Sequence, residues 1–167
     1  PIAISGLGIM ASVVDVLSVK TREDATQKEL IAALDRGVHI ASAILLVGSA
    51  VVCAFLLQGV LLPNRLGWMG LWGCVVLGLM VGLAIGKATE YYTSYEYPPT
   101  RGIAVAGDTG PATVIIEGTA IGMLSTWPPI VAVIVGIVGA FLLCGGFANL
   151  TLGLFGVALA SVGMLST

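Results

Sequence analysis

The feature that most constrains this chain is a set of long apolar runs that contain almost no charge. The run 70–86, for example, has no Asp, Glu, Lys or Arg. Charged residues make up 10% of the chain and hydrophobic residues 57%, with a mean hydropathy of +1.06. Soluble domains carry about 25% charged residues, so these few charges cannot cover a water-soluble globule. The sequence therefore predicts an all-α fold, a polytopic transmembrane helix bundle.

Five apolar runs are expected to cross the membrane, within one transmembrane domain that covers residues 1–167. The expected spans are about 1–19, 38–58, 69–90, 112–147 and 150–167. The fourth run is too long for one simple span, because at about 1.5 Å per residue it exceeds a hydrocarbon core of about 30 Å. Pro128 and Pro129 are expected to kink this long helix. The alternative is that the fourth run forms two separate segments.

Local signals predict where the second helix begins. Thr26 is followed three residues later by Glu29, which is the spacing of a capping box. The second helix is therefore expected to start near Gln27, with its first turns outside the hydrocarbon because they carry several charges.

The segment 95–109 is polar and separates two apolar runs. Pro98 and Pro99 are expected to break any helix there, so the sequence predicts a loop. Thr109, which stands just before Gly110 and a proline, is expected to cap the following helix.

A small-residue ladder runs along the third span. Gly78, Gly82 and Gly86 are four residues apart, with Cys74 one step earlier. Such spacing allows the backbone of a neighbouring helix to approach closely. One further step reaches Glu90, so its carboxylate is expected to lie near the close-packed stripe.

Glu90 is the main candidate for ion coupling, because ionisable residues near membrane depth are costly and are functional candidates by default. Lys87 is its possible partner in an ion pair one helical turn away. Tyr91 is a secondary candidate, although an interfacial aromatic role accounts for it equally well. Asp15 and Glu117 are also acidic residues in apolar surroundings, and pairing near the membrane surface is the simpler interpretation of both.

Two threonines are further secondary candidates. Thr109 and Thr113 place hydroxyl groups at the start of the fourth run, where the N-terminus of a helix can attract an anion. Capping alone explains them as well.

Several kinds of site are not indicated by the residue pattern. The cysteines are isolated within apolar runs, His39 is the only histidine, and no Asp cluster is present. No metal site and no catalytic residue are therefore assigned in this chain. No basic patch with interleaved aromatic residues is present either, so no nucleic-acid partner is expected.

The distribution of basic residues predicts the orientation. The loop 20–28 carries three of them, and the region around loop 91–109 carries Lys87 and Arg101, whereas the intervening loop has only Arg65. Loops 20–28 and 91–109 are therefore expected to be cytoplasmic. The chain begins and ends within apolar runs, so it is expected to be a fragment of a longer multi-pass protein.

From these residues alone, the chain fits an ion pump, a channel, a secondary ion or solute transporter, or a non-enzymatic structural membrane subunit. A transporter would place its site at helices broken near the middle of the membrane. At the Pro128 break, the hydroxyl groups of Ser125 and Thr126 are the only ones that could form such a site.

Specific motifs go further than composition. The segments concerned are Thr89-Glu90-Tyr91-Tyr92-Thr93-Ser94, Thr109-Gly110-Pro111-Ala112-Thr113, Gly163-Met164-Leu165-Ser166-Thr167 and the opening Pro1–Ile9. In this order and spacing the chain resembles the membrane-integral inorganic pyrophosphatases, which are pyrophosphate-energised proton or sodium pumps. The first and third of these motifs are the specific ones.

The resemblance implies a homodimeric pump that hydrolyses pyrophosphate to two phosphates with Mg²⁺ and exports a proton or sodium ion. It implies that the ligands of Mg²⁺ and pyrophosphate lie in parts of the chain outside this fragment, which alone would be inactive. It also implies that Glu90 matches a glutamate linked to coupling, and that residues 110–147 lie near the dimer contact. A bacterial plasma membrane is the expected location.

Overall fold

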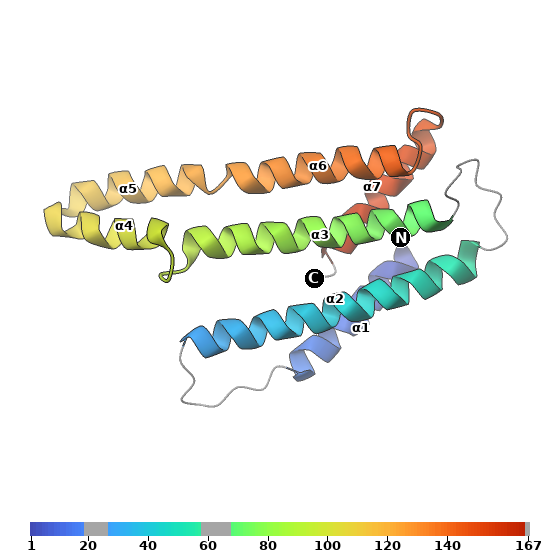
Figure 1. Cartoon of the computed structure of the whole chain (residues 1–167), viewed down its shortest axis with the longest axis horizontal. Helices are drawn as coiled ribbons and strands as arrows, with labels where there is room; N and C mark the ends of the chain where they lie inside the picture. The colour runs from blue at the N-terminus through green and yellow to red at the C-terminus, as the bar shows by residue number, and fades with distance from the viewer. Residues whose placement is uncertain (19–26, 58–67, 166–167) are drawn as a thin grey trace. The chain divides into compact units, whose positions relative to one another are not determined.

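The computed structural model describes residues 1–18, 27–57 and 68–165, without the side chains of Asp15, Ser18, Leu57 and residues 27–30. Every regular element in these ranges is a helix, so the predicted all-α class is confirmed (Figure 1). The helices are α1 (Ile2–Ser18), α2 (Gln27–Leu57), α3 (Trp68–Thr93), α4 (Pro98–Ala106), the short 3-10 helix η1 (Gly107–Thr109), α5 (Pro111–Leu124), α6 (Trp127–Leu143) and α7 (Leu150–Leu165).

Several of these helices are long and apolar enough to cross a membrane. Three stretches meet this condition by length and composition, namely Ile31–Leu56, Trp68–Thr109 and Pro111–Leu143, and Ile2–Val14 and Leu150–Leu165 are shorter apolar helices. They fit the predicted bundle. α2 is described from Gln27 onwards. The expected helix start near Gln27, the Thr26 cap, most of the loop 20–28 and the Asp15 side chain adjoin or fall on residues outside what is described.

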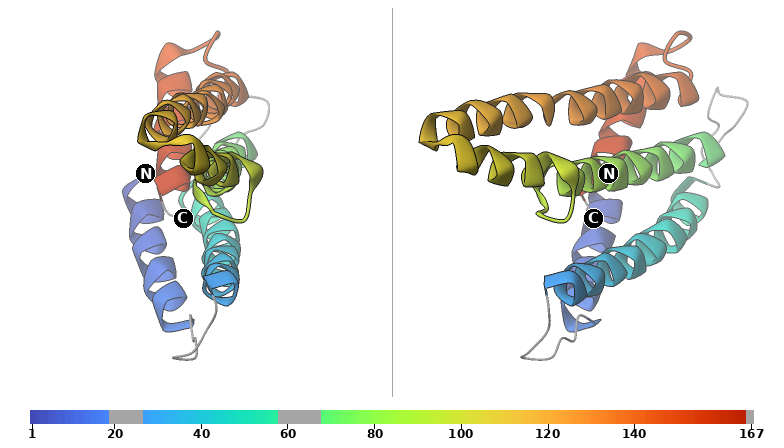
Figure 2. Two further views of the ribbon diagram at one scale, coloured as in Figure 1. Left: turned by 90° about the vertical axis from the view of Figure 1, so that its left-hand side faces the viewer. Right: turned by 60° about the vertical axis from the view of Figure 1, so that its left-hand side comes forward.

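The chain forms two compact units. The first consists of Pro1–Gly82 with Gly136–Thr167, and the second of Leu83–Val135. In the first unit α1 lies alongside α2, as both views of Figure 2 show. A Cβ atom placed on Gly48 of α2 would collide with the Leu7 side chain of α1, 2.5 Å away, so this glycine allows the two helices to pack.

Close backbone contacts hold α3, α6 and α7 together in the first unit. A Cβ atom at Gly78 of α3 would overlap the carbonyl oxygen of Ala160 of α7, and one at Gly163 of α7 would lie 2.6 Å from the Val75 oxygen. A Cβ at Gly136 of α6 would lie 3.0 Å from the Val81 side chain of α3. The predicted small-residue packing is therefore present at Gly78.

The same packing does not continue towards Glu90. Among the residues that the structure describes, no heavy atom lies within 4 Å of a Cβ placed on Gly86. The expectation that Glu90 lies near a close-packed stripe is therefore wrong for this part of the chain, because the contact with α7 is confined to the first half of α3.

In the second unit, α4 packs against α5 (Figure 1). The expectation that Pro98 and Pro99 would prevent a helix is wrong, since they begin α4 in its first turn. The backbone N–H groups of the first turn have no helical partner, so proline loses nothing there and its fixed φ favours the helix.

The long fourth run is interrupted between α5 and α6, at Ser125 and Thr126. The hydroxyl groups of these residues donate to the carbonyl oxygens of Gly122 and Met123, at 2.8 and 2.7 Å. Proline has no N–H to offer the preceding turn, which explains why the break comes just before Pro128. The expected broken helix is thus observed, with hydroxyls bonding to carbonyls at the break.

Candidate functional site

Glu90 lies in the last turn but one of α3, in the second unit. Its side chain is half-buried and that of Lys87 is exposed, while its backbone carbonyl accepts a hydrogen bond from the Ser94 N–H at 2.9 Å. Within the described residues, neither Glu90 nor Lys87 forms a salt bridge with the other. The carboxylate is therefore left partly shielded without a cation beside it, and its coupling role stays a prediction.

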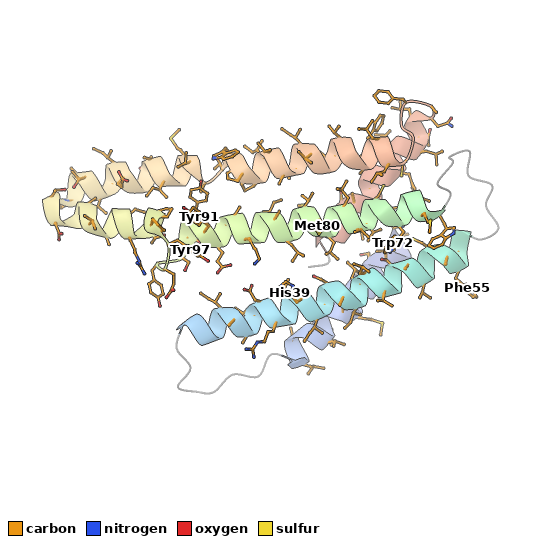
Figure 3. All side chains as sticks on the ribbon, in the orientation of Figure 1. His39, Phe55, Trp72, Met80, Tyr91 and Tyr97 are labelled. Atoms are coloured by element: carbon orange, nitrogen blue, oxygen red, sulfur yellow. The ribbon has the colours of Figure 1, made fainter. Side chains whose placement is uncertain are left out.

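Tyr91 is the centre of an aromatic cluster at the corner between α3 and α4 (Figure 3). Its ring lies 5.1 Å from that of Tyr97, with an interplanar angle of 49°, and 5.2 Å from that of Tyr92, in an edge-to-face arrangement. Aromatic pairs at these distances contribute about 0.5–1.5 kcal/mol each beyond the area they bury. Tyr91 thus links the end of α3 to the residue that caps α4.

Hydrogen bonds fasten this corner. The Thr100 hydroxyl donates to the Tyr92 carbonyl at 3.2 Å, and the Arg101 Nε donates to the Tyr95 carbonyl at 3.2 Å. Both bonds run from α4 back to the connection or to α3. Arg101 therefore serves the turn itself, and its charge remains exposed at the surface of the corner.

Thr109 and Thr113 are brought together at the far end of the second unit. Their hydroxyl oxygens lie 2.7 Å apart, each lies 2.8 Å from the Ala106 carbonyl, and the Thr113 hydroxyl also lies 2.6 Å from the Gly110 carbonyl. The hydroxyls thus bond to carbonyl groups at the turn between α4 and α5.

The expected N-cap at Thr109 is wrong. The residue before α5 is Gly110, which has φ +130°, and it makes no side-chain capping bond. Glycine alone adopts such a conformation without strain, so the chain turns at Gly110 and Thr109 faces back towards Ala106. An anion-binding role for Thr109 and Thr113 stays a prediction.

Glu117 lies on α5 and is exposed. Its Oε1 would be 3.8 Å from a Cβ atom placed on Gly102 of α4, so it lies against the α4 backbone. In the parts of the chain that are described, no three His, Cys, Asp or Glu residues gather closely enough to hold a metal ion. The polar groups of the second unit shape a corner that includes the half-buried Glu90.

The cysteines are isolated in the sequence, and the contact between two of them was not predicted. The Sγ atoms of Cys74 in α3 and Cys144 at the end of α6 lie 3.2 Å apart, and both residues are buried. They are separated by seventy positions in the chain, so no local spacing could reveal the pair. The crossing of α3 and α6 alone brings them together.

Comparisons with known proteins match the whole chain. The family model described as "Inorganic H+ pyrophosphatase" matches residues 1–167. Relatives from Bacteroides thetaiotaomicron and Clostridium tetani, both named "Putative K(+)-stimulated pyrophosphate-energized sodium pump", are 46% and 41% identical over 100% of this chain. A relative from Moorella thermoacetica named "K(+)-insensitive pyrophosphate-energized proton pump 2" is 34% identical, also over 100% of this chain.

The chain spans only a fraction of these relatives. It covers 22%, 23% and 24% of the lengths of the Bacteroides, Clostridium and Moorella proteins, respectively.

Proposed function

Because this chain belongs to the inorganic H+ pyrophosphatase family, we propose that it is part of a membrane pump that hydrolyses pyrophosphate to two phosphates and exports a cation. The observation that carries the proposal is the family match, which extends over every residue of the chain. The apolar helices support it, because such a pump must conduct its ion through a bundle of transmembrane helices. This chain would supply helices and the Glu90 corner to that bundle.

Mg²⁺ is the proposed cofactor, held by parts of the full-length protein outside this chain. A divalent cation that clamps the charged oxygens of pyrophosphate would stabilise the charge that develops during hydrolysis. The chain offers no described cluster of carboxylates for such an ion, and it covers about a quarter of its relatives' length or less.

The proposed transported cation is Na⁺, with H⁺ as the second candidate. The relatives named as sodium pumps that share the greater identity, 46% and 41%, support the first choice. The relative named as a proton pump, at 34% identity, supports H⁺ as the second candidate.

The proposed assembly is a homodimer in a bacterial plasma membrane, with loops 20–28 and 91–109 in the cytoplasm. The positive-inside rule supports this orientation, because the basic residues gather on that side of the predicted spans. The broad apolar surface of α5 and α6, with Ile115, Ile130 and Val138 more than half exposed, must be covered by lipid or by protein.

The experiment uses inverted membrane vesicles that carry the intact protein. Pyrophosphate with Mg²⁺ should drive accumulation of ²²Na⁺ that persists in a protonophore, while chelation of Mg²⁺ should abolish hydrolysis. Acidification without Na⁺ uptake would select the proton instead. Hydrolysis without uptake of either ion, or no hydrolysis at all, would contradict the proposed pump.

A further inference from the structure

The strongest unassigned feature of the chain is the thiol pair of Cys74 and Cys144 in the first unit. We propose that these two residues form a redox-active dithiol, which a hydroperoxide converts into a disulfide that joins α3 to the end of α6. The proposal rests on the geometry of the pair and is independent of the proposed function.

The distance between the two sulfur atoms is the first argument. The two Sγ atoms are 3.2 Å apart, so only a small movement separates the thiol pair from a covalent bond. The third thiol, Cys53 of α2, is also buried but makes no such contact within the described residues. The chain thus offers one reactive pair and one internal control.

Hydrogen bonding orients the pair. The Cys74 thiol lies 3.4 Å from the Ala140 carbonyl, which also accepts the Cys144 backbone N–H at 3.2 Å. If Cys74 donates to this carbonyl, Cys144 donates its own S–H to the Cys74 sulfur. In this arrangement the Cys144 S–H points at the Cys74 sulfur, and the Ala140 carbonyl holds both residues in place.

The surrounding helices hold this arrangement. Gly156 of α7 faces Cys144 so closely that a Cβ atom there would collide with its sulfur. The Cys144 sulfur therefore contacts α7 at Gly156 as well as Cys74 of α3. Reactions between groups held in this way benefit from a high effective molarity, because little freedom remains to be lost.

Both cysteines of the pair lie near a helix end. Cys144 is the first residue after α6, where the chain turns at Gly145 with φ +71° before α7 begins. Cys74 lies in the second turn of α3. Both side chains are buried, so the oxidant must be a small uncharged molecule such as hydrogen peroxide.

One molecule of hydrogen peroxide oxidises one pair of thiols. The Cys144 thiol, as its thiolate, attacks a peroxide oxygen; the O–O bond breaks, and a sulfenic acid and one water form. The Cys74 thiol then attacks that sulfur, and the second oxygen leaves as water. The two thiols lose two electrons and two protons in total, and the peroxide takes up both.

The test uses membranes that carry the full-length protein, treated with hydrogen peroxide and then with copper phenanthroline, an oxidant that dissolves in the bilayer. Free thiols are blocked with N-ethylmaleimide in detergent, and the digest is analysed without reduction. Mass spectrometry should find a linked Cys74–Cys144 peptide that dithiothreitol removes. Cys53→Ala should retain the link, and Cys74→Ala and Cys144→Ala should each lose it.

Two results would overturn the proposal. One is that both cysteines remain fully alkylated after both oxidants. Copper phenanthroline dissolves in the bilayer, so poor access of the oxidant to the pair would then not explain the missing link. The other is that Cys53 replaces either residue in the linked peptide of the wild-type protein.

Discussion

Gly78 of α3 and Ala160 of α7 touch backbone to backbone, because a Cβ atom at Gly78 would overlap the Ala160 carbonyl oxygen. In a membrane the lipid is as apolar as the side chains, so helices associate through close packing of this kind rather than through the hydrophobic effect. The contact fixes where α3 and α7 cross, and Gly163 of α7 repeats it against Val75.

Gly78→Ala is expected to destabilise the full-length protein by about 1–3 kcal/mol, the usual cost of overpacking. The backbone of α7 cannot yield as a flexible side chain would. The measurement is the unfolding temperature of the detergent-solubilised protein. Gly86→Ala is the matched control, and it should be neutral or stabilising, because the site is open within the described residues and alanine favours the helix. Equal losses in the two variants would contradict the role of the α7 contact.

Glu90→Gln in the full-length protein is expected to reduce cation transport more than pyrophosphate hydrolysis. The half-buried carboxylate has no salt-bridge partner among the described residues, so its charge is available to interact with a moving cation. Parallel assays of hydrolysis and ion uptake give the ratio of the two rates. Glu117→Gln changes an exposed carboxylate that lies beside α4, and as the control it should leave the ratio unchanged. Equal loss of both activities in Glu90→Gln, or loss of neither, counts against coupling.

Tyr91→Ala is expected to loosen the corner between α3 and α4 by about 1–3 kcal/mol, because two aromatic contacts of about 0.5–1.5 kcal/mol each are lost. Tyr91→Phe keeps both ring contacts and should behave like the wild-type protein. Limited proteolysis of the 95–97 connection measures the opening of the corner. Tyr95→Ala removes a ring that makes no stacking contact within the described residues, and it serves as the control. Faster cleavage in Tyr91→Phe than in Tyr91→Ala would refute the aromatic explanation.

Gly110→Ala is expected to cost about 1–3 kcal/mol, because the φ of +130° at this position strains any L side chain. The loss should appear as a lower unfolding temperature in the full-length protein. Gly118→Ala, at a helical glycine of α5 with open space around it, should not show this loss. If the two variants are equally stable, the backbone at Gly110 is not constrained as described.

Much of the fold follows from periodicity and composition. The charge-free run 70–86 predicted a long helix, and α3 extends from Trp68 to Thr93. The paired prolines correctly indicated a break in the fourth run, which is observed between α5 and α6. These features depend on residues close to one another in the chain, where backbone geometry and hydrophobicity alone decide.

Position within a helix explains one failure. Pro98 and Pro99 were expected to prevent a helix, but they occupy the one turn in which proline is favourable. Proline breaks a helix only in its interior, whereas Pro98 and Pro99 stand at a helix start. The left-handed turn at Gly110, which displaces the expected cap at Thr109, has the same origin, because glycine permits two conformations and sequence does not say which one is used.

The sequence by itself determined that this chain is a bundle of apolar helices, and its motifs indicated the family to which it belongs. Only the tertiary structure decided that Gly78 is packed and Gly86 is open, and that Cys74 meets Cys144. The physical reason is that the crossing points of helices depend on contacts between distant segments. Equal spacing along one helix therefore cannot distinguish a residue that meets a neighbouring backbone from one that does not.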